Sequence, residues 1–304
     1  MHIHTHNEWS ELQSVVVGTA TNANWPSKDI AFQKQKTSWT KTPIPSGPVL
    51  DKIINETNED LEELCQTLSA FGVEIFRPKD LNYQKLDTMS GYNPRDRLLI
   101  IGNRVFDVNM RFSCRQHGIE AYDFIPNIEP IDDNLAIFDA ANVCRIGKDL
   151  LYLVSESGTR EGGEWLRNTF EGEYNVHILD NIYDGVHIDS TITALNDHTV
   201  LLNASRINKD NLPKIFKDWN CIFINDCVPI DFYEYPYASK WLGMNMFSID
   251  SKTVVVDKNQ EEIIKILEKN NFTVIPLQLR HSRTLGGGFH CVTLDLWRED
   301  FING

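Results

Sequence analysis

A cysteine late in the sequence follows three consecutive glycines, in the segment Leu285-Gly286-Gly287-Gly288-Phe289-His290-Cys291. Glycines accept backbone conformations with positive φ and let a backbone approach a ligand closely. A thiol held at the end of such a loop can attack an electrophile as a thiolate. A tight turn before a strand that begins with cysteine accounts for the same residues, so the segment alone leaves both interpretations open.

Two other segments carry the residue types that a cysteine nucleophile needs. His187 and Asp189 are two positions apart, so their side chains share one face if the segment is extended. Histidine is the usual proton shuttle near neutral pH. Asp139, next to two alanines, suits a carboxylate that orients the histidine or binds a cationic substrate. Each of these residues, taken alone, also has an ordinary structural explanation.

Neither a metal site nor a phosphate loop is expected. The alternating His2, His4 and His6 could chelate a metal from one face of a strand, but they lie at a terminus, where chains fray. The glycines Gly286–Gly288 are followed by neither the Gly-Lys-Ser/Thr of a phosphate loop nor a helix. We therefore predict no metal and no cofactor.

Strands and helices that could position these residues recur along the chain. Apolar runs rich in β-branched residues predict strands at intervals of about 50 residues, a spacing typical of internal repeats. Segments with helical spacing precede four of them. The predicted strands are 73–76, 122–125, 176–179, 222–224 and 273–275, and the predicted helices are 58–71, 161–170, 211–219 and 260–270.

Hairpins are predicted ahead of these helices, at 98–101/104–108, 144–146/150–153, 191–195/199–202 and 245–249/253–256. A fifth unit is divided between the two ends of the chain, where 14–17 would pair with 291–296. The repeated order of hairpin, helix and strand predicts a single α/β domain over residues 1–304. Its five ββαβ repeats would form a propeller-like ring.

A ring would bring distant polar residues together. Segments 93–96, 138–142, 186–189 and 285–291 each lie near the start of a hairpin, and corresponding positions of ring-forming repeats converge on the central axis. Residues 22–48, rich in Pro, Ser, Lys and Asn, predict a long loop, either a lid over one mouth of the ring or a disordered segment.

The composition narrows the classes of partner. With 43 acidic and 29 basic residues, a net charge of −14 argues against nucleic acids and anionic membrane surfaces as partners. No apolar stretch reaches the roughly 18 residues of a membrane span, and no signal peptide is recognisable. The six cysteines lie far apart without a C-x-x-C pair, which is typical of a reducing compartment, so we expect a cytoplasmic protein.

In this order and spacing the motifs resemble those of the amidinotransferase family, which includes arginine:glycine and inosamine-phosphate amidinotransferases. The segment 285–291 is similar to the family's nucleophile motif, 138–141 and 187–189 to its acidic and His-x-Asp motifs, and 239–242 with 244–245 to a further signature. The resemblance runs from about Asn93 to Arg298. It implies a five-bladed α/β propeller of the pentein type.

The resemblance also implies a reaction in which an amidino group passes from L-arginine to an amine such as glycine, with release of ornithine. Cys291 would be the nucleophile that carries the amidino group, His187 the general acid and base, and Asp139 its carboxylate partner. The residues implied to hold the two ends of arginine are Asp96, Asp189, Arg206 and Ser239. The expected partners are thus arginine and an amine acceptor, and family members are often homodimers.

Two departures from the pattern of glycine-using relatives leave the acceptor open among glycine, lysine and other amines. They are Tyr237-Ala238 before Ser239, and Asp184-Gly185-Val186 before His187.

Two alternative functions remain open. An arginine or agmatine deiminase would use the same Cys, His and Asp residues but pass the intermediate to water, although Phe289 and segment 239–242 are more similar to transferases. A guanidine-binding protein or an interaction scaffold is the other alternative, and its role would not depend on Cys291.

Overall fold

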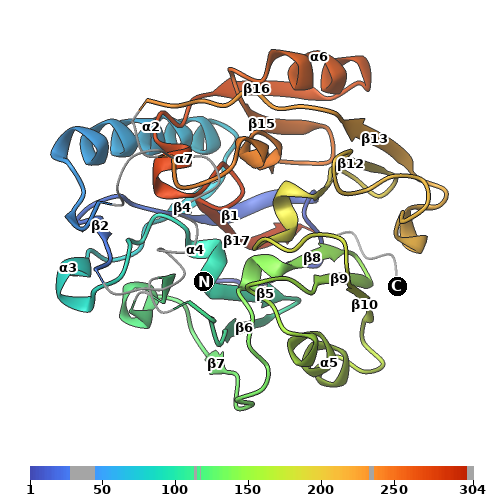
Figure 1. Cartoon of the computed structure of the whole chain (residues 1–304), viewed down its shortest axis with the longest axis horizontal. Coiled ribbons are helices and arrows are strands. Elements are labelled where there is room, and N and C mark those ends of the chain that lie inside the picture. Colours follow the sequence, from blue (N-terminus) through green and yellow to red (C-terminus); the bar gives the residue numbers. More distant parts are fainter. Residues whose placement is uncertain (28–44, 113–114, 117, 233–235, 300–304) are drawn as a thin grey trace.

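The computed structural model describes residues 1–27, 45–112, 115–116, 118–232 and 236–299. These residues form an α/β structure with five three-stranded sheets and one two-stranded sheet. Figure 1 shows the long helices α2 (Asp51–Ala70), α5 (Arg160–Thr169) and α6 (Glu261–Lys269) at the outer edge of the molecule.

All five three-stranded sheets share one topology. The central strand pairs antiparallel with one neighbour and parallel with the other, which confirms the predicted hairpins followed by a parallel strand. Four sheets are continuous in sequence: β5 (Leu98–Ile101), β6 (Arg104–Asp107) and β7 (Ile128–Pro130); β8 (Val143–Ile146), β9 (Asp149–Leu153) and β10 (Asn175–Leu179); β11 (Ile192–Ala194), β12 (Thr199–Asn203) and β13 (Asn220–Ile224); β14 (Phe247–Ser248), β15 (Thr253–Asp257) and β16 (Thr273–Leu277). The predicted helix before the parallel strand is present in three units, as α2, α5 and α6, whereas the described residues of the connections from β6 to β7 and from β12 to β13 contain only the 3₁₀ turns η3 (Ile119–Tyr122) and η6 (Lys214–Phe216).

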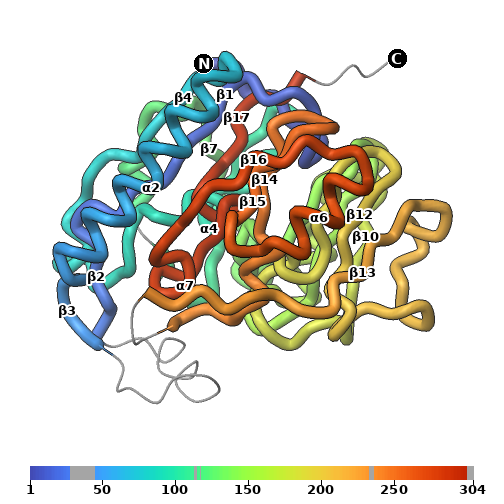
Figure 2. The backbone as a smooth tube through the Cα atoms, turned by 90° about the horizontal axis from the view of Figure 1, so that it is seen from above, coloured from blue at the N-terminus to red at the C-terminus, as the bar shows by residue number. Residues whose placement is uncertain are grey.

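The fifth sheet joins the two ends of the chain, as predicted. Strand β1 (Glu11–Val17) pairs antiparallel with β17 (Thr293–Glu299) and parallel with β4 (Glu74–Phe76). In this register Val15 lies opposite Asp295, and Val17 lies opposite Thr293. Figure 2 shows β17 running beside β1, with α2 along the same side of the molecule.

Helix α2 is longer than predicted, since it begins at Asp51 and not at Asn58. Its buried side chains, which include Ile53, Leu61 and Leu68, recur at helical spacing and form one stripe toward the core. The chain leaves the helix through Gly72, whose φ of +84° is a left-handed conformation that glycine adopts without strain.

Two predicted elements are wrong. Segment 211–219 contains only the 3₁₀ turn η6 (Lys214–Phe216), because Pro213 disfavours helix before it and β13 begins at Asn220. Segment 122–125 is no strand: η3 (Ile119–Tyr122) ends there, and the Ile125 amide donates to the Tyr122 carbonyl at 2.8 Å. Tyr122 and Ile125, three positions apart, are the apolar residues of this turn and not of a strand. The third strand of this sheet is β7, which pairs with β6.

The structure describes only part of the loop predicted at 22–48. Short strands β2 (Asn24–Trp25) and β3 (Gly47–Pro48) pair at its two ends, and residues 28–44 lie outside the described residues.

A short helical turn precedes the first strand of every three-stranded sheet. The turns are α4 (Pro94–Arg97), η4 (Ala140–Asn142), η5 (Ile188–Ser190), η7 (Lys240–Met244) and α7 (Ser282–Leu285). Turns of successive repeats contact one another, in the order α4, η4, η5, η7 and α7. Because the predicted site residues lie in or beside these turns, the fold brings them together.

Beneath these turns lies a buried cluster of charges around Asp295 of β17. Its carboxylate accepts hydrogen bonds from Arg95 Nη2 at 2.7 Å, from Arg145 Nη2 at 2.9 Å and from Arg298 Nε at 2.6 Å. Glu8 shares Arg145 at 2.8 Å. Although burial alone would raise it, these arginines hold the pKa of Asp295 well below its usual range, so the cluster is ionised.

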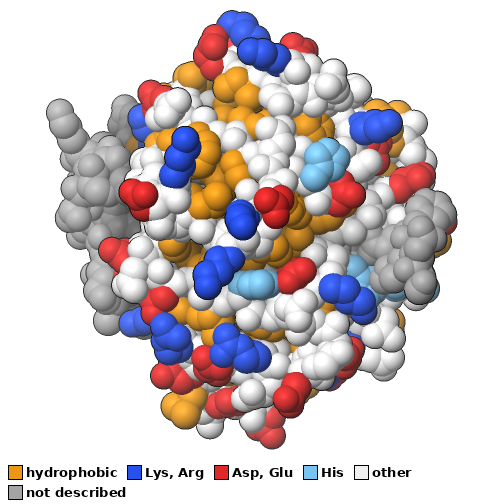
Figure 3. All heavy atoms as spheres, turned by 90° about the vertical axis from the view of Figure 1, so that its right-hand side faces the viewer, with side chains coloured by type: hydrophobic (Ala, Val, Ile, Leu, Met, Phe, Trp, Pro, Cys, Tyr) orange, Lys and Arg blue, Asp and Glu red, His pale blue; other side chains and the backbone are white. Residues whose placement is uncertain are grey.

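The described part of the surface has no comparable cluster on the face that Figure 3 shows, where acidic and basic side chains are interspersed. None of the described helices combines the length and apolar character needed to cross a membrane.

Replacing Asp295 by asparagine is expected to lower the free energy of unfolding by about 3–5 kcal/mol, because the arginines would keep their buried charge without its partner. Urea titration measures the change. As a control, Asp123→Asn removes an exposed partner of Lys79 and is expected to leave stability nearly unchanged. Equal, small effects of both substitutions would contradict the importance of the cluster.

Candidate active site

A cavity of about 410 Å³ lies over the short turns and contains most of the predicted site residues. This volume is within the range of about 300–1,000 Å³ that is usual for small-molecule sites. Cys291, His187, Asp189 and Ser239 line the cavity together with Arg115. Tyr183 and Tyr237 supply aromatic walls, and Glu156 and Asp184 add carboxylates.

The loop that carries Cys291 is packed so closely that its glycines cannot be replaced without a shift. Gly286 has φ of +78°. A Cβ on Gly287 would lie 1.9 Å from Asn93 Oδ1, and one on Gly288 would lie 2.8 Å from Asn245. Gly286 therefore allows the turn, and Gly287 and Gly288 allow the close packing against Asn93 and Asn245. Cys291 follows this loop and lines the cavity.

Asn245 and Asp189 hold the thiol of Cys291. The Asn245 amide accepts from the Cys291 backbone N–H at 3.0 Å, and its Nδ2 lies 3.2 Å from Sγ. Sγ donates to Asp189 Oδ2 at 3.4 Å. Burial, and then the charges of Asp189 and Asp96, raise the pKa of the Cys291 thiol well above its ordinary value. In the empty site the nucleophile is thus a thiol, and a cation beside it would favour the thiolate.

His187 lies between two carboxylates. Its Nε2 is 2.9 Å from Asp139 Oδ2, and its Nδ1 is 3.6 Å from Asp96 Oδ1. Burial opposes the charged ring, but Asp96 and the hydrogen bond to Asp139 outweigh it and raise the pKa of His187. The imidazole can therefore carry a proton near neutral pH and donate it to a leaving group.

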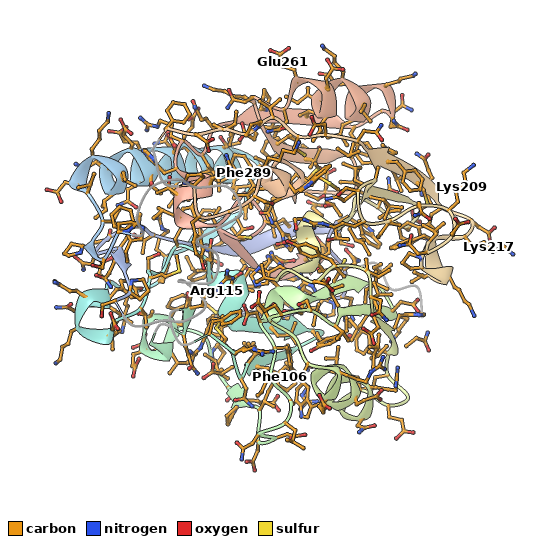
Figure 4. The ribbon with its side chains drawn as sticks, in the orientation of Figure 1. Phe106, Arg115, Lys209, Lys217, Glu261 and Phe289 are labelled. Atoms are coloured by element: carbon orange, nitrogen blue, oxygen red, sulfur yellow. The ribbon has the colours of Figure 1, made fainter. Side chains whose placement is uncertain are left out.

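Asp96 is paired with a guanidinium that belongs to the chain itself. Arg115 Nη1 lies 3.4 Å from Asp96 Oδ2, 3.6 Å from Asp139 Oδ2 and 3.2 Å from His187 Nε2. Figure 4 shows Arg115 in the interior, below Phe289. Burial raises the pKa of Asp96 to about 6, although His187 and Arg115 oppose this. Among the described residues, none donates a hydrogen bond to Asp96 Oδ1.

Four of the seven predicted site residues line this cavity, namely Cys291, His187, Asp189 and Ser239. Asp96 and Asp139 lie behind His187 and Arg115. Arg206 also lies behind the lining, next to Tyr183 and Ser190. Its guanidinium lies 3.4 Å from the Tyr183 ring centroid and donates to the Ser190 carbonyl at 2.9 Å. The predicted direct contact of Arg206 with substrate therefore needs Tyr183 to move.

Sequence reasoning missed the part that Arg115 plays in the site. Arg115 lies in the connection between β6 and β7, outside any periodic or motif-bearing segment, and only the fold brings it to the cavity. Asn245 belonged to a recognised motif, but its contact with Cys291 follows only from the fold.

Three side chains of the site have potential metal-ligand atoms that lie close to one another. One donor atom each from Asp96, His187 and Cys291 lie within 4.8 Å of one another. His187 and Cys291 already form hydrogen bonds, to Asp139 and Asp189 respectively.

Comparison with known proteins decides the family. No model of a protein family matches the chain. The sequence is, however, 36% identical to inosamine-phosphate amidinotransferase 1 from Streptomyces glaucescens in an alignment of 336 positions that covers 97% of each chain. The chain belongs to the amidinotransferase family.

Two further relatives of this amidinotransferase agree with that assignment. The solved structure of an inosamine-phosphate amidinotransferase from Streptomyces griseus superposes with a TM-score of 0.91 at 35% identity, covering 98% of this chain and 97% of the other. The mitochondrial glycine amidinotransferase of Xenopus tropicalis is 28% identical, with 97% of this chain and 82% of the relative covered. Both are named for transfer of amidino groups, so this chain is a transferase.

The pKa of Asp96 predicts an acid limit of the amidinotransferase reaction. A carboxyl with a pKa of about 6 loses its charge as the pH falls below 6, and binding of a cationic substrate weakens with it. We expect kcat/KM for a guanidinium substrate to fall about tenfold per pH unit below about pH 6. An Asp96→Asn variant should show a lower rate without this limb, whereas an unchanged limb would assign the titration to another group.

Proposed function

We propose that this amidinotransferase moves the amidino group of L-arginine to a small primary amine through an amidino-cysteine on Cys291, with release of ornithine. The observation that carries the proposal is the arrangement of Cys291, His187 and Asp96, which each place one donor atom within 4.8 Å of the other two, beside the buried guanidinium of Arg115. A nucleophile, a proton donor and a guanidinium ligand are the groups that this transfer needs.

The acidic floor of the cavity supports a guanidinium as the donor group. The carboxylates of Asp96, Asp139 and Asp189 are buried within a small region, and Arg115 shows that a planar guanidinium fits against two of them. Asp96 Oδ1 accepts no hydrogen bond from the described residues, but it is buried behind His187 and Arg115, so a substrate guanidinium would reach it only if Arg115 moved. Carboxylates suit the forked donors of a guanidinium better than a point charge.

The first half-reaction follows from these positions. A bound guanidinium offsets the charges of Asp189 and Asp96, which lowers the pKa of the Cys291 thiol and releases its proton. The thiolate attacks the guanidino carbon, and the bond from that carbon to the chain nitrogen of arginine breaks. The protonated His187 donates a proton to the departing nitrogen, so that ornithine leaves as an amine.

The second half-reaction reverses these roles. His187, now neutral, accepts a proton from the incoming amine, whose nitrogen attacks the amidino carbon on Cys291. The carbon–sulfur bond breaks, the thiolate returns and a new guanidino compound forms. The relatives are named for two different acceptors, an inosamine phosphate and glycine. We therefore propose a primary amine as the acceptor class and leave its identity to experiment.

The proposed reaction draws on residues beside all five sheets, so we also propose how these sheets are arranged. We infer that the five three-stranded sheets are the blades of a pentein-type ring, supported by their common topology and by the contacts between successive turns. In such a ring each turn contributes to one central cavity, which would explain why residues from five repeats serve one reaction.

Product analysis with arginine and a panel of amines tests the proposal. We expect ornithine and a new guanidino compound in equal amounts, with glycine, lysine and aminocyclitol phosphates as the first acceptors to compare. Cys291→Ala is expected to reduce turnover at least about 10⁴-fold, as removal of a catalytic nucleophile does. Cys65→Ala is the matched control, because Cys65 is also buried but lies in α2.

Citrulline formed without any amine would contradict transfer and indicate a deiminase with the same catalytic residues. Unchanged turnover in Cys291→Ala would contradict the covalent route.

A further inference from the structure

His290, the residue before the nucleophile, bridges two carboxylates from distant parts of the chain. Its Nδ1 lies 3.0 Å from Asp189 Oδ2, and its Nε2 lies 3.2 Å from Glu8 Oε2. An ionised carboxylate only accepts hydrogen bonds, so a ring nitrogen that carries a proton donates to the carboxylate that it faces. The side chain is largely buried, with 13% of its surface exposed.

Glu8, the outer partner of His290, is fixed by the buried charge cluster. Its Oε1 accepts from Arg145 Nε at 2.9 Å and from the Arg145 backbone N–H at 3.1 Å. Its Oε2 lies 2.8 Å from Arg145 Nη2 and 3.5 Å from Arg95 Nη1. Arg95 Nε also donates to the carbonyl oxygen of His290 at 2.8 Å. Both the side chain and the backbone of His290 are therefore attached to the cluster.

Asp189, the inner partner, connects His290 to the reacting thiol. The same oxygen, Oδ2, faces His290 Nδ1 and the Sγ of Cys291. Asp189 lines the cavity, whereas His290 and Glu8 are not among the described residues that do so. Any influence of His290 on the reaction must therefore pass through Asp189 and the adjoining backbone.

We propose that His290 is a positioning residue, which Glu8 anchors and which in turn fixes the orientation of the ionised Asp189 beside Cys291. The proposal deepens the proposed function, since Asp189 is a predicted ligand of the donor guanidinium. It assigns a role to Glu8, which lies in the segment before β1 and is 283 residues away from Cys291 in sequence.

The charges around Asp189 agree with this role. Although burial alone would raise it, the hydrogen bond and charge of His290 lower the pKa of Asp189 to about 2. Asp189 therefore stays ionised through the acid range in which Asp96 titrates. Several charged or titratable groups among the described residues face Asp189: His290 and Cys291 before β17, His187 of the same turn, Asp96 of α4, Cys144 of β8 and Arg206 after β12. His290 faces Asp189 and Glu8.

His290→Gln tests the proposal, because glutamine has no ring that places one nitrogen at each carboxylate. Without the hydrogen bond and charge of His290, the pKa of Asp189 should rise. We expect log kcat/KM for arginine to fall more steeply with decreasing pH than in the unsubstituted protein, because a second carboxyl group then titrates in the acid range. At neutral pH, kcat/KM should fall about 10–100-fold, the usual effect of removing the partner of a substrate-binding group.

A second readout does not need the substrate. Loss of the hydrogen bond from His290 leaves the charge of Asp189 less compensated, which raises the pKa of the neighbouring thiol. Alkylation of Cys291 by iodoacetamide at about pH 8.5, followed by peptide mass spectrometry, is expected to be about tenfold slower in His290→Gln. This readout stays valid if arginine proves not to be the donor, so failure of the proposed function and failure of this inference are distinguishable.

His281→Gln provides the matched control. His281 is also buried and lies 2.7 Å from a carboxylate, that of Glu56, but it does not line the cavity. If His290→Gln and His281→Gln melt at similar temperatures and only the former changes the slope and the alkylation rate, the proposal holds. Equal slopes and equal alkylation rates would overturn it. Should His290→Gln fail to fold, His290→Asn is compared in the same way.

Discussion

The buried carboxylate of Asp295 holds three arginine side chains that come from three different parts of the chain. Arg95 follows the first residue of α4, Arg145 lies in β8, and Arg298 shares β17 with Asp295. Charges removed from water are tolerated only when they are paired and hydrogen-bonded, so these elements have to meet in one arrangement. The short turns that carry the catalytic residues are attached to the same elements, and the site inherits this arrangement.

Three buried carboxylates, those of Asp96, Asp139 and Asp189, lie in or behind the cavity together with Arg115 and two histidines. Burial, and then the charges of Asp189 and Asp96, raise the pKa of the Cys291 thiol. In the mechanism that we propose, a bound guanidinium offsets these charges, so binding and activation of the nucleophile depend on the same interaction.

Much of the fold could be predicted from the sequence because the signals are local. Hairpins with short turns, the helical stripe of α6 and the pairing of β1 with β17 follow from periodicity and turn residues. Segments 122–125 and 211–219 could not be assigned correctly in this way, because an i, i+3 turn imitates a strand in the first and Pro213 shortens the helix in the second.

Within the site, the motifs around Cys291, His187 and Asp139 are visible in the sequence since each chemical group has neighbours that mark it. Arg115 and Glu8 have no such neighbours, and only tertiary contacts bring them to the site. The position of Arg206 behind Tyr183 likewise depends on how two loops pack, which no local pattern records.

The covalent intermediate is the central claim, and the intact mass of the protein after brief incubation with arginine alone tests it most directly. We predict a gain of one amidino group, located on Cys291 by peptide analysis, that disappears when an amine acceptor is added. Turnover of arginine with an unmodified Cys291 at every time point, in a sample quenched fast enough to trap a thiol adduct, would contradict the account.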